Sequence, residues 1–249
     1  MEPQVTELLK QDSFGRVERI EVVGPAGAVA TSYVRRVAAG GRLPGSAFVA
    51  RRLLARERRA LARLGDLDGV PGLREDVPME AGVGSASVLV RSWIPGTALH
   101  SARTLPRDFF ERLEDLVRAL HDRRVCHNDL HKEANVLVRP DGSPALVDFQ
   151  LSSVHGSLGR TFEVRVSEDL RHVEKHARRY RLAGRPAPAS EPQRTRRSFG
   201  SALWRRTGKP LYNLVTRRIL GWQDGEPRRA SSGPWPEWGP PLGPDQGRD

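Results

Sequence analysis

The chain has 249 residues and a formal net charge of +11, and it contains one cysteine, Cys126. The length suffices for a two-lobed domain with a sizeable core, and the single cysteine excludes an internal disulfide framework or a cysteine-based zinc site. No apolar run approaches the roughly 18 residues that span a bilayer and no secretory signal opens the chain, so we expect a soluble, cytoplasmic protein.

The amino-terminal part of the chain predicts an antiparallel sheet with one helix. Three strand-like runs, separated by Gly, Pro and Ala, cover residues 5–37. A helix is expected from about Phe48 to Leu64, followed by extended runs around residues 73–79 and 86–93. These elements predict a five-stranded antiparallel unit.

One acidic residue, Glu57, stands on the apolar face of the predicted helix. It lies four residues after Leu53 and four before Leu61, so a carboxylate is placed among leucines. Because burial of an unpaired carboxylate is costly, we expect a cation beside it.

From residue 94 the pattern becomes mainly helical. A helix is predicted over "DFFERLEDLVRALHDRRV", and the short apolar runs "NVLVRP" and "ALVDF" around an Asp-Gly turn predict a hairpin. A further helix is expected to begin at Ser167. A Pro-, Ser- and Arg-rich linker follows over residues 183–198, and residues 223–249 have the composition of a disordered tail.

The positive charge is concentrated near the end of the chain. Residues 171–221 hold 14 Lys and Arg and two Glu, so the rest is close to neutral. Such a segment favours an anionic partner. The helix predicted over "KPLYNLVTRRILGW" either lies on an anionic membrane surface or packs on the preceding domain, and we favour packing. A nucleic-acid partner rests on charge alone and is disfavoured.

Three oxygen-bearing side chains surround the predicted hairpin. Asp129 precedes it, Asn135 begins its first strand and Asp148 ends its second, so the hairpin brings all three towards one mouth. Phosphoryl transfer requires divalent cations held by hard oxygen ligands and a carboxylate that orients the attacking hydroxyl. The pattern therefore favours a magnesium–phosphate site.

The motifs "HNDLHKEANVL" and "LVDFQ" resemble the catalytic loop and metal-binding motif of the protein-kinase-like superfamily, near its small bacterial RIO-type, Kdo-kinase and lipopolysaccharide-core kinase branch. The resemblance implies an α+β, two-lobed fold. Its amino-terminal lobe would be the five-stranded antiparallel unit with one helix, residues 1–93. Residues 94–222 would form a shortened, mainly helical carboxy-terminal lobe with basic helices.

The resemblance also implies a role for each residue of the loop. Asp129 would be the catalytic carboxylate, Asn135 and Asp148 the magnesium ligands, and His127 a structural brace. Lys132 is expected to contact the transferred phosphate. The loop departs from the usual pattern, because Asn135 stands six positions after Asp129 instead of five.

Nucleotide-binding residues are implied in the amino-terminal part. "KQDSFGRVERI" resembles the end of a Gly-rich phosphate loop and keeps Gly15 and Val17, while Lys10 offers a phosphate contact at its start. Ser92 lies in "VLVRSWIPG", which would join the lobes, and the backbone groups from Arg91 to Trp93 would bind the base.

The usual lysine that pairs with the helix carboxylate is missing from the third strand, "YVRRVA". Arg35 or Arg36 would pair with Glu57 instead. We prefer Arg35, because an apolar residue usually precedes the ion-pairing position. Arginine is a real chemical change here, since it brings a planar fork and a permanent charge.

The function expected is that of an ATP- and Mg²⁺-dependent kinase acting on a hydroxyl, with an atypical serine/threonine protein kinase as the first choice. A sugar or lipopolysaccharide-core (glycolipid) kinase is the alternative, favoured by the lack of a clear "APE" element. A pseudokinase acting as a nucleotide-binding or scaffold module is the second alternative, favoured by the missing lysine. We expect a cytoplasmic location, with the inner membrane surface as an option.

Overall fold

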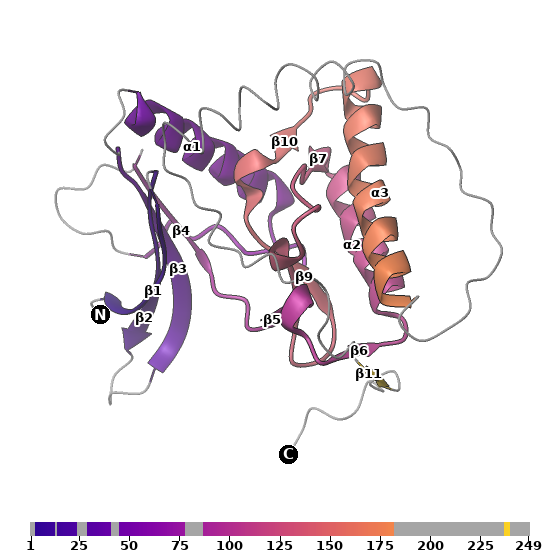
Figure 1. Ribbon diagram of the computed structural model, residues 1–249. Coiled ribbons are helices and arrows are strands. Elements are labelled where there is room, and N and C mark those ends of the chain that lie inside the picture. Colours follow the sequence, from indigo (N-terminus) through magenta and orange to yellow (C-terminus); the bar gives the residue numbers. More distant parts are fainter. Residues whose placement is uncertain are drawn as a thin grey trace, which may run out of the picture. The chain divides into compact units, whose positions relative to one another are not determined.

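The computed structural model describes residues 3–12, 14–23, 29–40, 45–77, 87–181 and 237–239 (Figure 1). They form an α+β fold whose amino-terminal part is an antiparallel sheet. Within these ranges no helix combines the length and the apolar character that crossing a membrane would require. The linker and the basic helix expected between residues 183 and 222 lie outside the described residues.

The amino-terminal sheet has four strands in the order β1-β2-β3-β4, all antiparallel. They are β1 (Pro3–Asp12), β2 (Gly15–Val23), β3 (Val29–Ala38) and β4 (Val88–Ser92). The turn between β1 and β2 requires glycine at position 15. Its φ is 139°, and a Cβ there would lie 1.9 Å from the Val37 carbonyl oxygen.

The prediction of a fifth strand is wrong over residues 73–77. Only a single bridge joins Leu73 to Arg91, after which the chain leaves the ladder. Beyond this bridge Glu75 and Asp76 are exposed, and the Arg74 guanidinium donates to both carboxylate oxygens of Asp76, at 2.9 and 2.7 Å. Residues 78–86, which complete the expected run, lie outside the described residues.

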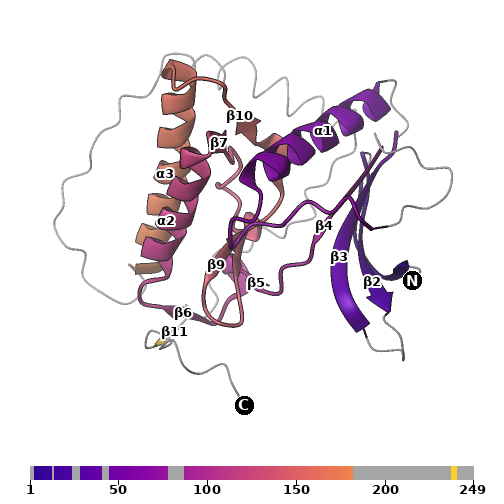
Figure 2. The same ribbon diagram turned by 180° about the vertical axis from the view of Figure 1, so that it is seen from behind.

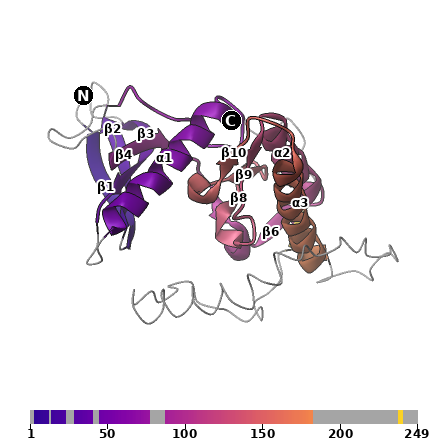
Figure 3. The ribbon, with the colours of Figure 1, turned by 90° about the horizontal axis from the view of Figure 1, so that it is seen from above.

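Helix α1 (Ser46–Leu64) packs against strands β3 and β4 and also contacts the later elements η4 (Phe149–Leu151) and β10 (Ser153–Val154) (Figure 3). Its buried stripe has the three- and four-residue spacing of an amphipathic helix and includes Leu54, Glu57 and Leu61. Leu89 of β4 joins the same apolar cluster as these leucines. The helix therefore carries Glu57 towards the sheet.

The remaining described elements run from residue 97 onwards. They are β5 (Thr97–Ala98), η2 (Leu99–Ser101), β6 (Thr104–Pro106), α2 (Phe109–Asp122), β7 (Val125–Cys126), η3 (Glu133–Asn135), β8 (Val136–Val138), β9 (Pro144–Leu146), η4 (Phe149–Leu151), β10 (Ser153–Val154), α3 (Arg160–Arg181) and β11 (Glu237–Gly239). Helices α2 and α3 pack side by side (Figure 2). Strand β11, inside the range predicted as a tail, pairs in parallel with β6.

The hairpin predicted from the Asp-Gly turn is confirmed. Strands β8 and β9 pair antiparallel with Val136 opposite Leu146, and Gly142 adopts a φ of 76° in the turn. The start predicted for the last helix, Ser167, is wrong, because α3 begins seven residues earlier at Arg160. Burial of Phe162 explains the extra turns, since this ring packs against His121 and His155.

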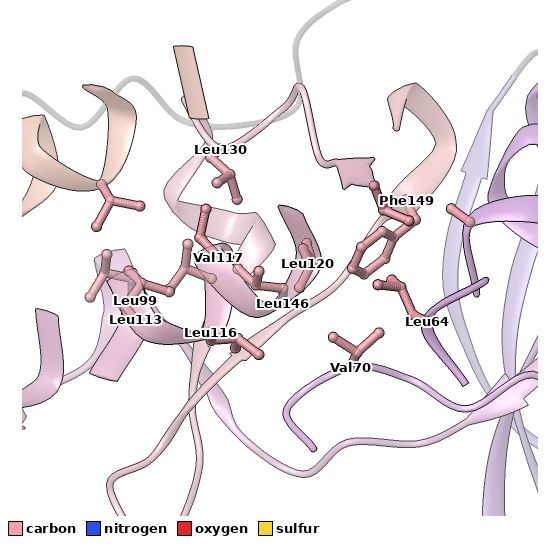
Figure 4. Close-up of a cluster of buried hydrophobic side chains, with 14 of the residues drawn as sticks. Leu64, Val70, Leu99, Leu113, Leu116, Val117, Leu120, Leu130, Leu146 and Phe149 are labelled. Atoms are coloured by element: carbon pink, nitrogen blue, oxygen red, sulfur yellow. The ribbon is translucent and has the colours of Figure 1, made fainter. Parts of the chain in front are cut away.

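The main core lies where α2 meets the hairpin and the end of α1 (Figure 4). Leu113, Val117 and Leu120 of α2 are fully buried, together with Leu146 of β9 and Phe149 of η4. Burial of such side chains stabilises the fold by roughly 1.5–3 kcal/mol each. The core includes Val136 and Leu146 of the hairpin, so it positions the polar residues Asn135 and Asp148 at the adjoining end of β8 and β9.

Candidate active site

The hairpin brings Asn135 and Asp148 to the same end of strands β8 and β9. The backbone N–H of Val147 donates to the Asn135 carbonyl oxygen at 3.0 Å, which ties the two ends together. Asp148 has a φ of 67°, in the left-handed region that a non-glycine residue rarely adopts. Such a conformation is typical of residues held for a function.

Asp129 is in direct contact with Asn135 despite the extra residue between them. The Asn135 Nδ2 donates to the Asp129 carboxylate Oδ2 and to its carbonyl oxygen, both at 3.0 Å. His131 Nδ1 lies 3.0 Å from Asp129 Oδ1, and Lys132 Nζ lies 3.0 Å from Oδ2. The structure thus places the predicted Asp129, Lys132 and Asn135 in one contact group.

The carboxyl of Asp129 is ionised at neutral pH although it is buried. Burial alone would raise its pKa, but His131 and Lys132 outweigh this effect and hold the pKa below its ordinary value. A buried carboxylate with this charge can accept a hydrogen bond from a hydroxyl. Asp129 therefore has the protonation state of a catalytic base.

Glu133, inside the loop, is held by contacts with helix α3. It begins the short turn η3, and Tyr180 of α3 donates its hydroxyl hydrogen to Glu133 Oε2 at 2.8 Å. Arg179 of α3 donates to Glu133 Oε1. His176 lies 3.7 Å from the same oxygen and makes a 2.7 Å hydrogen bond to the Leu130 carbonyl. Helix α3 thus fixes the longer loop.

Asp169 of α3 is a second brace, which the sequence analysis missed. Its carboxylate is fully buried and accepts hydrogen bonds from the backbone N–H groups of His127 and Asn128, at 2.8 and 2.9 Å. His121 Nε2 lies 3.2 Å from Oδ2. The sequence did contain a signal for this brace. Asp169 lies four residues before the buried Val173 of α3, so the helical period places an acidic residue on the buried face, just as it places Glu57 four residues before Leu61 in α1.

The ring of His127 joins the loop to the hairpin. Burial lowers its pKa, so the ring is neutral. Its Nε2 lies 3.0 Å from the carbonyl oxygen of Val147 and must carry the hydrogen that it donates there. Nδ1 is then the acceptor that faces the Asp129 N–H at 3.4 Å. Through this ring the position of Asp129 depends on the residue that precedes Asp148.

His121, Cys126 and Asp169 lie close enough to suggest a metal site, since their ligand atoms are within 4.8 Å of one another. Their chemistry does not fit one. Both oxygens of Asp169 already accept backbone N–H groups, and burial raises the pKa of the Cys126 thiol to about 12. A protonated thiol is a poor metal ligand, so this cluster acts as a structural brace.

The preference for Arg35 as the partner of Glu57 is wrong. Arg36 Nη1 lies 3.7 Å from Glu57 Oε2, whereas Arg35 donates to Glu18 at 2.8 Å. Alternation along β3 is the reason, because neighbouring side chains point to opposite faces of a sheet. Arg35 is paired directly with Glu18 of β2 and shares its face, away from α1. A second arginine, Arg91 of β4, also contacts Glu57, at 3.5 Å.

Of the other residues expected to bind nucleotide, some lie on one face of the amino-terminal sheet and Ser92 lies at the end of β4. Lys10, Val17 and Arg36 form a row across the sheet, since Val17 is the register partner of both others, and Gly15 forms the turn beside this row. Ser92 has a structural contact, because its Oγ accepts the N–H of Gly72 at 2.9 Å. The row places Lys10 on the same face of the sheet as Arg36.

The buried His172 of α3 should make the stability of the protein depend on pH. Burial lowers the pKa of His172 to about 4, against an ordinary value of 6.5. Between these pH values the unfolded chain binds a proton at this ring that the folded chain does not, so lowering the pH favours unfolding by up to about 1.4 kcal/mol per pH unit. Urea unfolding between pH 7 and 4.5 should show this slope. His172→Gln should reduce it, and an unchanged slope in that variant would contradict the assignment.

Comparison with known proteins gives a partial similarity. No family model matches the chain. Over 159 residues, 56% of the chain, it is 28% identical to the serine/threonine-protein kinase C of Synechocystis sp. (strain ATCC 27184 / PCC 6803 / Kazusa), and the match spans 28% of that protein's length. The chain is thus similar over part of its length to a serine/threonine protein kinase, which indicates a kinase-like relationship.

Proposed function

We propose that the protein is an ATP-dependent phosphotransferase of the serine/threonine protein kinase type, from the small atypical RIO-like branch. The observation that carries this proposal is the ionised carboxylate of Asp129, in contact with Asn135 and Lys132 at the mouth of the hairpin. The similarity to a serine/threonine-protein kinase supports it. In this proposal residues 1–93 and 94–222 are the two lobes and 223–249 the tail.

In the proposed mechanism Asp129 orients the hydroxyl of the acceptor and takes its proton. The hydroxyl oxygen forms a bond to the γ-phosphorus of ATP while the bond to the bridging oxygen breaks, and ADP leaves. Lys132 places its ammonium 3.0 Å from Asp129, where it would stabilise charge on the transferred phosphoryl group.

The residues at the mouth fit a magnesium ion. The amide of Asn135 uses its nitrogen to donate to Asp129, which leaves its oxygen for a cation. Asp148 adds a carboxylate, one oxygen of which accepts from Gln150 at 2.6 Å. Hard oxygen donors of this kind suit Mg²⁺. The ion would neutralise charge on the nucleotide phosphates, while Asn135 and Asp148 hold it.

The proposal is tested with the purified chain, labelled ATP and Mg²⁺, and Asp148→Ala as the control. Serine- and threonine-containing protein acceptors and a sugar or core glycolipid acceptor are offered separately. We expect transfer to the protein acceptor by the wild type and loss of transfer in Asp148→Ala. Transfer to the glycolipid alone would replace the protein acceptor with the sugar alternative. If the wild type neither binds ATP nor exceeds the control, the kinase function is wrong.

A further inference from the structure

Two arginines converge on a single buried carboxylate at the sheet face of α1. Arg36 Nη1 lies 3.7 Å from Glu57 Oε2, and Arg91 Nε lies 3.5 Å from Oε1. Arg36 and Arg91 come from the neighbouring strands β3 and β4, where Val34 is the register partner of Arg91 and Leu89 that of Arg36. The two guanidinium groups therefore project from the same face of the sheet.

Glu57 is joined to the two arginines by ion pairs without hydrogen bonds. Both carboxylate oxygens of Glu57 and the Nε of Arg91 are buried without a hydrogen-bond partner. Among the described residues, no hydrogen bond is formed by the side chain of Arg36 or Arg91. Each guanidinium has five N–H donors in a planar fork, so most of the donors remain for a ligand.

The ion pairs of this group leave one of the two arginine charges without a carboxylate of its own. One carboxylate faces two permanent cations, and the side chains of Glu57, Arg36 and Arg91 are 0%, 10% and 12% exposed. Burial also raises the pKa of Glu57 against the opposing effect of Arg91 and Arg36, and a proton gained there would leave still less negative charge. A buried excess of positive charge is costly unless an anion accompanies it.

The position of the group relates it to the candidate active site. The negative charge of Asp148 contributes to the raised pKa of Glu57, so the field of the candidate active site reaches this group. Lys10 and Val17 continue the row that begins at Arg36.

We propose that Arg36 and Arg91 form a two-arginine phosphate site whose guanidinium groups are positioned by Glu57. Arg91 of β4 would then bind the nucleotide in addition to Arg36 of β3. The inference rests on the proposed function in taking the phosphates to be those of ATP. The arginine fork suits phosphate oxygens, which it binds through two parallel N–H groups. In the competing view, Arg91 only holds α1 against the sheet.

Calorimetric titration separates the two views. Mg·ATP, adenosine and magnesium-free tripolyphosphate are titrated into the wild type, Arg91→Met and Arg91→Lys. Arg74→Met is the matched control. The Arg74 backbone N–H donates to Val90 of the same strand, and its half-buried side chain contacts Asp76 instead of Glu57. Thermal unfolding of each variant reports whether α1 is still docked.

We expect Arg91→Met to weaken binding of ATP and tripolyphosphate by about tenfold to a hundredfold, with adenosine affinity changed by less than about twofold. Arg91→Lys should recover part of the loss and Arg74→Met should match the wild type. Equal loss of ATP and adenosine affinity, or unchanged tripolyphosphate affinity in a folded Arg91→Met, would overturn the phosphate site.

The same titrations distinguish this inference from the proposed function. If the wild type binds ATP and Arg91→Met binds it equally well, the phosphate role of Arg91 is wrong and the kinase proposal stands. If tripolyphosphate binding depends on Arg91 while the wild type binds no ATP and transfers no phosphate, the anion site stands and the kinase proposal is wrong. Absence of binding of either compound by the wild type contradicts both.

Discussion

Asp129→Asn is expected to lower the rate of phosphoryl transfer by about a thousandfold, within the 10²–10⁴ range typical of a lost general base. The reason is that an amide cannot take the proton of the acceptor hydroxyl, although it has nearly the shape of the carboxylate. The loop should keep its conformation, because Asn135 can still donate to the side-chain oxygen at position 129. Single-turnover rates with labelled ATP measure the effect.

Asp141→Asn is the matched control for this experiment. Asp141 lies in the exposed turn of the same hairpin, where its carboxylate accepts the backbone N–H of Ser143 at 2.9 Å. Its transfer rate should stay near that of the wild type. A wild-type rate in a folded Asp129→Asn would show that this carboxylate is not the base.

Asp169→Ala is expected to lower the free energy of unfolding by about 3–5 kcal/mol, the range for removing one partner of a buried charged interaction. The substitution leaves the backbone N–H groups of His127 and Asn128 buried without an acceptor and removes the contact with His121. Urea unfolding measures the loss. The transfer rate of the folded fraction should fall as well, because the loop that holds Asp129 is released.

Glu174→Ala on the same helix serves as the comparison for Asp169→Ala. Glu174 is exposed and contacts Arg178 one turn later, at 3.4 Å, so its loss should change the free energy of unfolding by less than about 0.5 kcal/mol. Equal stability of the two variants would mean that Asp169 is not a brace.

The elements with a strong hydrophobic period could be predicted from the sequence. The first three strands, helix α1 and the β8–β9 hairpin all lie where the pattern places them, because alternation and the Asp-Gly turn are local properties. The fifth strand is wrong over residues 73–77, where a single bridge joins the chain to β4, because pairing with a distant strand is not a local property of the sequence. The start of α3 failed because burial of Phe162 depends on rings far away in the sequence.

The contacts of the predicted site residues could be foreseen from the sequence only in part. Burial of Glu57 on a leucine stripe correctly required a cation, yet the choice between Arg35 and Arg36 depended on which face of β3 meets α1. That choice is set by strand register, which the spacing of residues does not reveal. The side chain of Arg91 was not predicted to contact Glu57, because the two residues are distant in sequence.

Two residues of α3 that hold the loop, Asp169 and Tyr180, determine how short a designed fragment of the protein can be. Asp169 and the Tyr180 hydroxyl contact opposite ends of the loop that carries Asp129, and they are separated by three turns of one helix. A fragment that ends before Arg160 keeps Asp129, Asn135 and Asp148 but loses every contact that this helix makes with the loop. Trimming for crystallisation or expression should therefore keep residues up to at least Arg181.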